Sequence, residues 1–260
     1  MITLDGKSIQ TAWWGPPPAE APTLVLLHEG LGSVDLWRGF PAALQQATGC
    51  GVFGYSRFGY GRSASVALPR PLTYMHDEAR HVLGRVLDAA GIRRCVLVGH
   101  SDGGSIAVIY AGEAADPRVT GLVTLAAHFI VEGICVSSIA GITRDFEAGP
   151  LRARLARHHD DVEAAFRGWS GAWLDPAFRD WDITAQMAGV RVPTLLLQGA
   201  DDPYGTVEQL RVAERHARCP LQTRLIPHAR HAPHIEAPEA TVQAVADFVV
   251  SVLEPQVVAS

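Results

Sequence analysis

A serine between two glycines, in the order Gly99-His100-Ser101-Asp102-Gly103, is the strongest chemical signal in the chain. An apolar, β-branched run precedes it and a stretch of small and apolar residues follows, so the pattern predicts a strand that turns sharply into a helix. Such a turn strains the backbone at the serine, and side chains at positions 99 and 103 would collide with the neighbouring strand and helix. We expect the turn to hold the Ser101 hydroxyl above a sheet, at the positive end of a helix.

A serine hydroxyl is a weak nucleophile, so Ser101 needs a general base, and the base needs a group that orients it. After a nucleophile turn of this kind, an acid and then a histidine follow in the loops after later strands. The loop after the apolar stretch 192–197 supplies two candidate acids, Asp201 and Asp202. The loop after the stretch 221–226 supplies three candidate histidines, His228, His231 and His234. The spacing alone leaves both aspartates open.

The order of apolar segments indicates an α/β protein. A β-hairpin is expected over residues 1–14. Further strands are expected directly before the serine turn and at 23–27, 51–55, 119–126, 192–197 and 221–226. Helical patterns occupy 34–48, 72–90, 206–217 and 238–253. Strands that are apolar on both faces and alternate with helices predict a mostly parallel sheet covered on both sides. In such sheets the functional site lies at the carboxyl ends of the strands.

One stretch interrupts this alternation. Residues 129–189 contain no candidate parallel strand, and 151–173 has a helical pattern. The simplest interpretation is an inserted helical cap over 129–189, with 1–128 and 190–260 forming the α/β core domain. Because the insertion lies over the strand ends, we expect Trp169 and Trp173 to form part of the wall of a substrate pocket.

The composition excludes several classes of protein. The chain has 260 residues, a formal net charge of −5, 48% hydrophobic and 19% charged residues, and no basic cluster that would attract nucleic acid or an anionic membrane. Its four cysteines lie far apart, without the spacing of a disulfide framework or a zinc site. The first residues lack the pattern of a signal peptide, and no stretch reaches 18 apolar residues. We therefore expect a cytoplasmic protein.

Four motifs together resemble the α/β-hydrolase superfamily, over essentially the whole chain. His28-Glu29-Gly30-Leu31-Gly32-Ser33 is similar to the oxyanion loop H-G-x-x-G-S, and residues 57–63 are similar to the turn R-G-x-G-x-S. Residues 199–202 resemble G-x-x-D, which places the family's acid on Asp202. Residues 231–238 resemble H-x-x-x-x-E-x-P, which places its histidine on His231. On this resemblance Asp201 would cap a turn, His228 lies too close to the strand end, and His234 would start a helix or support the site from behind.

The tetrahedral intermediate of acyl transfer needs two preorganised backbone donors. One is expected to be the N–H of Asp102, directly after the nucleophile, and the resemblance makes Gly30 the other. The chain departs from the family pattern at Glu29, where a glycine is usual. Glu29 either narrows the pocket and places a carboxylate near it, or points to solvent or pairs with an arginine.

The side chain of Asp102 has a second possible role, in substrate recognition. The run Ser101-Asp102-Gly103-Gly104, with the exit Ala127-His128-Phe129 into the insertion, resembles the valacyclovir-hydrolase-like (biphenyl-hydrolase-like) branch. A carboxylate beside the nucleophile favours substrates that carry a cationic group near the scissile bond. Alternatively, the Asp102 carboxylate is neutralised by a nearby arginine or faces away from the pocket.

The remaining histidines receive structural roles. We expect His28 to fix its loop and His100 to pack against the sheet. The run His158-His159-Asp160-Asp161 has residue types that bind metals, but adjacent helical residues do not converge on one ion, so a solvated turn is expected there. The glycines at 30 and 32 lack the third glycine of a dinucleotide-binding loop. The sequence therefore implies no metal and no cofactor.

Together these features predict a cofactor-independent serine hydrolase that cleaves a small carboxylic ester or thioester through an acyl-enzyme. Ser101, His231 and Asp202 would be nucleophile, base and orienting acid, and Glu29, Asp102, Trp169 and Trp173 would contact the substrate. A lactonase, an amidase or aminopeptidase, and a C–C bond hydrolase use the same triad, whereas a haloalkane dehalogenase needs aspartate at position 101. A small-ligand receptor without catalysis is the alternative outside enzymes. The expected partner is a small-molecule substrate, and a homodimer is left open.

Overall fold

The computed structural model describes residues 1–253. Its centre is a seven-stranded sheet with the order β3-β5-β4-β6-β7-β8-β9, in which only the edge strand β3 runs antiparallel to its neighbour. The strands are β3 (Thr11–Trp14), β4 (Thr23–Leu27), β5 (Gly51–Tyr55), β6 (Cys95–His100), β7 (Val119–Leu125), β8 (Thr194–Gly199) and β9 (Leu221–Ile226). A hairpin of β1 (Ile2–Leu4) and β2 (Lys7–Ile9) precedes them, as the sequence predicted.

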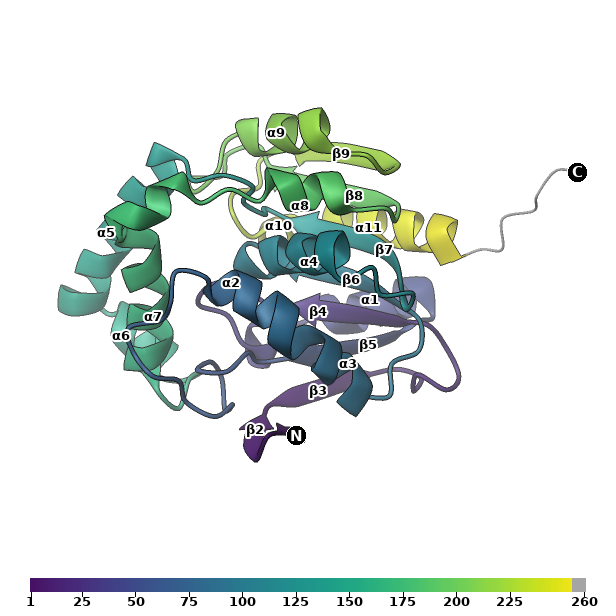
Figure 1. The fold of residues 1–260 in the computed structure, drawn as a ribbon, viewed down its shortest axis with the longest axis horizontal. Coiled ribbons are helices and arrows are strands. Elements are labelled where there is room, and N and C mark those ends of the chain that lie inside the picture. The colour runs from purple at the N-terminus through teal and green to yellow at the C-terminus, as the bar shows by residue number, and fades with distance from the viewer. Residues whose placement is uncertain (254–260) are drawn as a thin grey trace, which may run out of the picture.

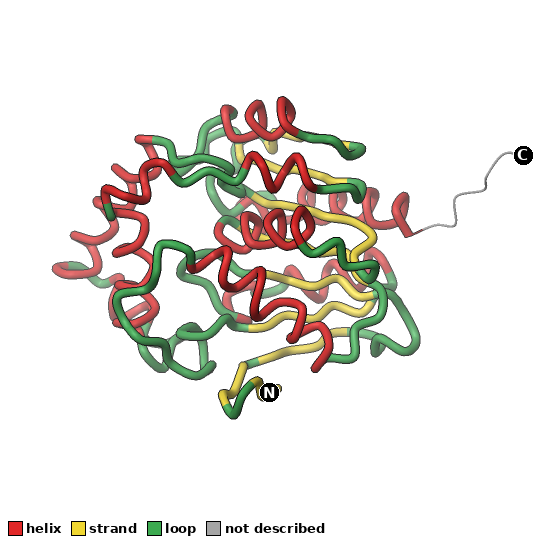
Figure 2. Tube along the Cα trace, in the orientation of Figure 1, coloured by secondary structure: helices red, strands yellow, loops and turns green. Residues whose placement is uncertain are grey.

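Helices cover both faces of the sheet (Figures 1 and 2). On one face α1 (Phe40–Thr48) contacts α11 (Pro238–Leu253). The other face carries α2 (Tyr74–Asp77), α3 (Gly84–Ala89), α4 (Asp102–Glu113), α8 (Thr184–Gly189) and α9 (Glu208–His216). A short α10 (Pro233–Glu236) precedes α11. The predicted fold class, a mostly parallel sheet covered on both sides, is confirmed.

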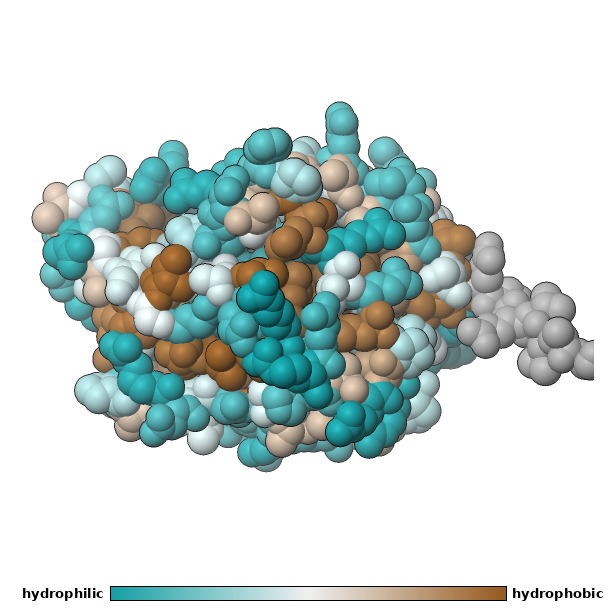
Figure 3. All heavy atoms as spheres, turned by 90° about the horizontal axis from the view of Figure 1, so that it is seen from above, coloured by the Kyte–Doolittle hydropathy of each residue, from teal (hydrophilic) through white to brown (hydrophobic). Residues whose placement is uncertain are grey.

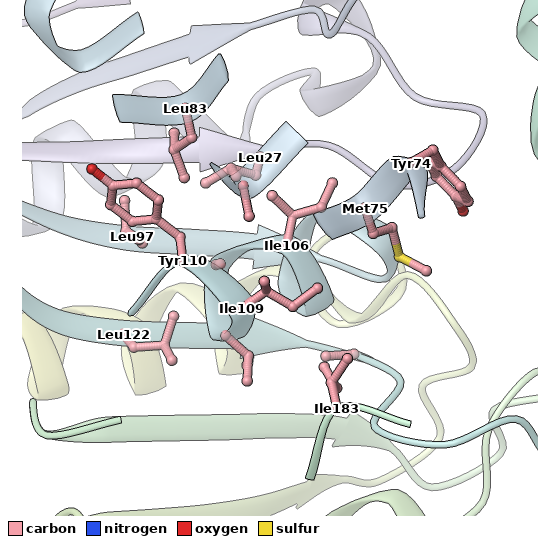
Figure 4. Close-up of a cluster of buried hydrophobic side chains, with 14 of the residues drawn as sticks. Leu27, Tyr74, Met75, Leu83, Leu97, Ile106, Ile109, Tyr110, Leu122 and Ile183 are labelled. Carbon is pink, nitrogen blue, oxygen red and sulfur yellow. The ribbon is translucent and has the colours of Figure 1, made fainter. Parts of the chain in front are cut away.

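Alternate residues of each strand supply two hydrophobic cores. In β4, Leu24 and Leu26 pack toward α1 and α11, whereas Val25 and Leu27 pack toward α4. Figure 4 shows the second core, where Leu97 and Ile106 lie beside Leu27. All six of these side chains are fully buried, and burial of each such side chain contributes roughly 1.5–3 kcal/mol. The strands therefore form a rigid base for the loops at their carboxyl ends.

The insertion after β7 forms a layer beside the strand ends (Figure 1). It contains α5 (Gly133–Ala148), α6 (Leu151–Leu155), α7 (Val162–Leu174) and a 3₁₀ helix over Pro176–Asp180. Helices α5 and α7 contact each other, whereas α8 packs on α4 and α9. Of the expected insertion 129–189, the part up to Asp180 thus lies beside the strand ends, and the last helix covers the sheet.

Three predicted helices are less continuous than their sequence patterns. The helix expected at 34–48 is a 3₁₀ turn (Val34–Trp37) and α1, separated where Arg38 adopts a positive φ of 52°. The helix expected at 72–90 contains a π-helical segment (Glu78–Leu83) between α2 and α3. The pattern at 151–173 is divided between α6 and α7. In each case the apolar spacing continues across the break, so periodicity alone does not reveal it.

The surface mixes polar and apolar side chains. The face in Figure 3 is largely hydrophilic with several hydrophobic patches. No helix within residues 1–253 is both long and apolar enough to cross a bilayer.

Candidate active site

Ser101 occupies the sharp turn between β6 and α4. Its φ of 51° and ψ of −120° place it in a strained region that a non-glycine residue rarely adopts. A Cβ atom on Gly99 would overlap the carbonyl of Gly103, and a Cβ on Gly103 would overlap the carbonyl of Leu27. Both positions therefore require glycine for the reason that the sequence indicated, which is close packing of the turn on its neighbours.

The structure brings Ser101, His231 and Asp202 together in line. The Nε2 atom of His231 lies 2.9 Å from the Ser101 hydroxyl oxygen. The Nδ1 atom of His231 lies 3.0 and 2.9 Å from the two carboxylate oxygens of Asp202. These three side chains come from loops at the carboxyl ends of β6, β9 and β8. The neighbouring Asp201 is exposed and makes only a backbone bond to the carbonyl of Ala229.

The Asp202 carboxylate is held by further donors. The amide of Gln198 donates to Oδ2 at 2.6 Å, and the backbone N–H of Tyr204 donates to Oδ1 at 2.8 Å. Burial raises the pKa of Asp202, but the hydrogen bond and charge of His231 and the Tyr204 N–H outweigh it, so the pKa lies below its usual value. Asp202 is therefore ionised at neutral pH and able to fix the tautomer of His231.

Two backbone N–H groups at the cavity lack acceptors within residues 1–253. Asp102 is the first residue of α4, and Gly30 lies in the loop after β4; both line the cavity above Ser101. Neither N–H has a hydrogen-bond acceptor within residues 1–253. A side chain at position 30 would overlap the indole of Trp169, which explains why this loop needs glycine there. The arrangement suits the stabilisation of an oxyanion.

A cavity of about 110 Å³ opens over Ser101. Its wall includes the four residues expected to contact substrate, Glu29, Asp102, Trp169 and Trp173. Six further wall residues were not assigned to the pocket from the sequence: Leu31, His128, Cys135, Ile139, Ile142 and Tyr204. The sequence did contain an indication for His128 and Tyr204, because both lie in loops after the carboxyl end of a predicted parallel strand, where functional sites of such sheets occur. The residues of α5 carried no such signal.

The carboxyl group of Asp102 accepts hydrogen bonds from other side chains of the protein. The Tyr74 hydroxyl donates to its Oδ2 at 2.5 Å, and the Trp173 indole N–H donates to its Oδ1 at 3.2 Å. The side chain has no exposed surface. Burial raises the pKa of Asp102, although the nearby charge of Arg57 opposes the shift. The charge of Arg57 agrees with the expectation of an arginine near Asp102. The bonds by which the carboxyl group anchors α7 to the nucleophile turn were not expected.

Glu29 points toward the site rather than to solvent or an arginine. Its Oε2 lies 3.3 Å from Nδ1 of His100, and the other ring nitrogen of His100 lies 2.7 Å from the carbonyl of His231. Burial lowers the pKa of His100, but the Glu29 carboxylate and this carbonyl raise it more, so the net shift is upward. The hydrogen bond and charge of His100 outweigh burial at Glu29 and lower its pKa. His100 therefore does more than pack against the sheet: it links two loops of the site.

Two further histidines fix loops. The N–H of Arg57 donates to Nε2 of His28, whose Nδ1 donates to the carbonyl of Glu29, so His28 holds its loop as expected. The expectation of a solvated turn at 158–161 is wrong for His159, which is buried. Its Nδ1 accepts from the N–H of Gly61, and its Nε2 donates to the carbonyl of Leu31. No metal-binding group of three or more acidic, histidine or cysteine side chains is found in the described part of the chain.

The sheet, the sharp turn at the serine and the inserted helices define an α/β hydrolase. Residues 22–182 match the family described as the alpha/beta hydrolase fold, and the chain belongs to this family. It is 30% identical over 94% of its length to a Variovorax paradoxus (strain S110) protein named for carbamate hydrolase activity, RutD, 96% of which is covered.

Solved structures share the fold. The enol-lactonase of Burkholderia xenovorans LB400 superimposes with a TM-score of 0.73 at 22% identity, covering 95% of this chain and 98% of that one. The proline iminopeptidase of Mycobacterium smegmatis superimposes with a TM-score of 0.76 at 19% identity, covering 96% and 97%. At these identities the likeness concerns the fold.

Proposed function

We propose that the protein is a serine hydrolase that cleaves a small carboxylic ester or thioester through an acyl-enzyme. The observation that carries the proposal is the unbroken line of hydrogen-bond distances from Ser101 through His231 to Asp202. The two unpaired amides of Gly30 and Asp102 beside Ser101 support it.

The reaction follows from this geometry. His231 takes the proton of Ser101 through Nε2 while the serine oxygen attacks the scissile carbonyl, and Asp202 stabilises the imidazolium that forms. The negative oxygen of the tetrahedral intermediate accepts hydrogen bonds from the two backbone amides; loss of one such donor typically costs about 10²–10³-fold in rate. His231 then gives its proton to the leaving group. A water activated by His231 hydrolyses the acyl-enzyme and restores Ser101.

The cavity limits the size of the substrate. Its volume of about 110 Å³ is smaller than the ~150 Å³ of a cavity that holds one benzene molecule. Ile139, Ile142 and Trp169 make much of its wall apolar. We therefore expect natural acyl and alcohol groups of a few carbon atoms; the larger leaving group of a reporter ester such as p-nitrophenyl acetate must extend beyond the cavity.

A carbamate is the second candidate substrate. The observation that favours it is the full-length similarity to a protein named for carbamate hydrolysis. The same serine would attack the carbamate carbonyl, which is less electrophilic than that of an ester. Lactones, amides and C–C bonds remain further options for the same triad, and binding without turnover is the alternative outside enzymes.

A labelling experiment tests the proposed mechanism. A fluorophosphonate probe should modify Ser101 stoichiometrically, and p-nitrophenyl acetate should be hydrolysed with a burst of p-nitrophenol. Ser101→Ala should abolish both, and His231→Ala should abolish most of the labelling. A parent protein that neither reacts with the probe nor hydrolyses the ester would favour a binding protein. Comparison of short alkyl esters, thioesters and carbamates then identifies the substrate class.

A further inference from the structure

His128 lies at the centre of the candidate active site but has no part in the triad. It lies in the loop that leaves β7, lines the cavity and is only 2% exposed. Its ring centroid lies 5.9 Å from that of His231 and 5.0 Å from that of Trp173, and the planes of the His128 and Trp173 rings are inclined at 63°. The imidazole is therefore enclosed between the catalytic histidine and the wall formed by α7.

The backbone fixes the position of this residue. The hydroxyl of Ser105 donates to the carbonyl of His128 at 2.7 Å, and the N–H of His128 lies 3.2 Å from the same hydroxyl oxygen. Ser105 belongs to α4, the helix that begins after the nucleophile. His128 is thus held at a constant place relative to Ser101.

The imidazole itself has no partner. Within residues 1–253 the hydrogen bonds of His128 are those of its backbone, and Nδ1 is buried without an acceptor or donor. By contrast, both ring nitrogens of His28, His100 and His159 lie at hydrogen-bond distance from protein atoms. Buried polar groups of native proteins are nearly always paired. Nδ1 of His234 is unpaired in the same way, but His234 does not line the cavity, whereas His128 does.

The surroundings of His128 also favour its uncharged form. Burial lowers its pKa to about 3, and the nearby His231 acts in the same direction. At neutral pH the ring is uncharged, so it offers one N–H donor and one nitrogen acceptor.

We propose that His128 is a specificity-determining residue that binds a polar group on the leaving-group side of the substrate. This inference rests on the proposed serine hydrolase function and narrows its substrates. The leaving group must lie against His231, because His231 protonates it, and His128 borders the cavity beside that ring. The substrates are therefore esters of alcohols that carry a hydroxyl, amide or second carbonyl close to the scissile oxygen.

The expected discrimination is substantial. A site with a buried group that hydrogen-bonds the substrate disfavours an analogue that leaves the group unpaired. We expect at least a tenfold higher kcat/KM, on the order expected for one neutral hydrogen bond, for an ester with the polar group than for its apolar analogue.

Matched esters test the proposal. Propyl acetate and 2-hydroxyethyl acetate differ only by the exchange of a methyl for a hydroxyl, and kcat/KM is measured for both by titration of the released acid. The parent protein should prefer the hydroxyethyl ester. In His128→Phe, which keeps an aromatic ring against Trp173, the ratio should approach one. His81→Phe, a matched change at an exposed site, should keep the parent ratio.

Several outcomes would overturn the inference. They are a parent ratio near one and a ratio unchanged in His128→Phe, including an equal fall in kcat/KM for both esters, which would indicate a role in acylation that does not depend on the polar group. A preference found only between ethyl butyrate and ethyl 3-hydroxybutyrate would place the polar group on the acyl side and also contradict it. Failure of Ser101 to react with fluorophosphonate, with no ester hydrolysed, would instead reject the proposed function.

A second measurement avoids substitution of His128. In Ser101→Ala labelled with ¹⁵N-histidine, addition of 2-hydroxyethyl acetate should shift the ring nitrogen resonances of His128, whereas propyl acetate should shift them far less. Equal or absent shifts with the two esters would overturn the proposal even if His128→Phe does not fold.

Discussion

Asp201 and Asp202 are adjacent in the sequence, but only one of them contacts His231. Both suit the role of the acid by type and spacing, and only the family resemblance favoured Asp202. In the structure Asp202 is buried against His231, whereas its neighbour is exposed. The choice depends on the direction in which the turn after β8 presents each side chain, which residue types do not encode.

This difference predicts that the same substitution strongly lowers kcat at position 202 and hardly changes it at position 201. Asp202→Asn should lower kcat by about 10³–10⁴-fold, because the amide cannot hold His231 in the required tautomer. Asp201→Asn, which changes one charge by the same chemistry, should keep kcat within about twofold, since surface changes of this kind have small effects. Steady-state kinetics with p-nitrophenyl acetate checks both, and equal losses in the two variants would contradict the assignment.

Only some residues of the site could be predicted from the sequence. Ser101 and the loops that carry the histidine and the acid followed from residue type, from order along the chain and from position after predicted strands. The contacts of His100, Asp102 and His128 did not, because their partners come from elements distant in the sequence. His100 links the loops that carry Glu29 and His231, and Asp102 bonds to α7. Such pairings are set by tertiary packing.

At the scale of elements, apolar runs identified the sheet well. Each predicted strand of the sheet is present to within a few residues, because strands buried on both faces are continuously apolar. Helix breaks were not predicted. Arg38 adopts a positive φ without being glycine, and the π-helical segment after α2 contains neither glycine nor proline. Gly39 and Pro41 beside the first break are a local signal that periodicity does not use, whereas no such residue lies within the second.

The glycines of α4 and α7 predict contrasting results for one substitution. Gly103→Ala should abolish esterase activity and lower the melting temperature, because the added methyl overlaps the carbonyl of Leu27. Gly171→Ala should raise the free energy of unfolding by about 0.5–1 kcal/mol, since this exposed helical position has open space around it. Urea unfolding measures the free energy of unfolding of both variants, while thermal unfolding and hydrolysis of p-nitrophenyl acetate measure the melting temperature and activity of Gly103→Ala. A Gly103→Ala protein with parent stability and activity would show that the turn has more room than the structure indicates.

At the scale of the whole molecule, buried neutral histidines set the response to acid. Burial lowers the pKa of His28 and His159, and lowers that of His128 and His234 to about 3. Below their unfolded pKa of about 6.5 these side chains take up protons on unfolding, so stability is lost as the pH falls. His100 has a raised pKa; its contribution is complete below about pH 6.5 and is lost as the pH rises.

The free energy of unfolding should therefore fall between pH 6.5 and 5.5. Each of the four histidines with a lowered pKa contributes a slope of up to about 1.4 kcal/mol per pH unit. Urea unfolding at pH 7.0, 6.5, 6.0 and 5.5 checks the sign and the size. A stability that is constant or that rises toward pH 5.5 would contradict the expectation.

The cavity wall has a further consequence. Its contributions from α5 and α7, Cys135, Ile139, Ile142, Trp169 and Trp173, all fall within residues 133–174. No hydrogen bond of the Ser101–His231–Asp202 line involves that segment. The proposed proton transfer and much of the pocket wall are thus carried by different segments of the chain, which meet where the Trp173 indole donates to Asp102. Exchange of this segment among relatives that keep tryptophan at position 173 would diversify specificity on one unchanged set of reacting groups.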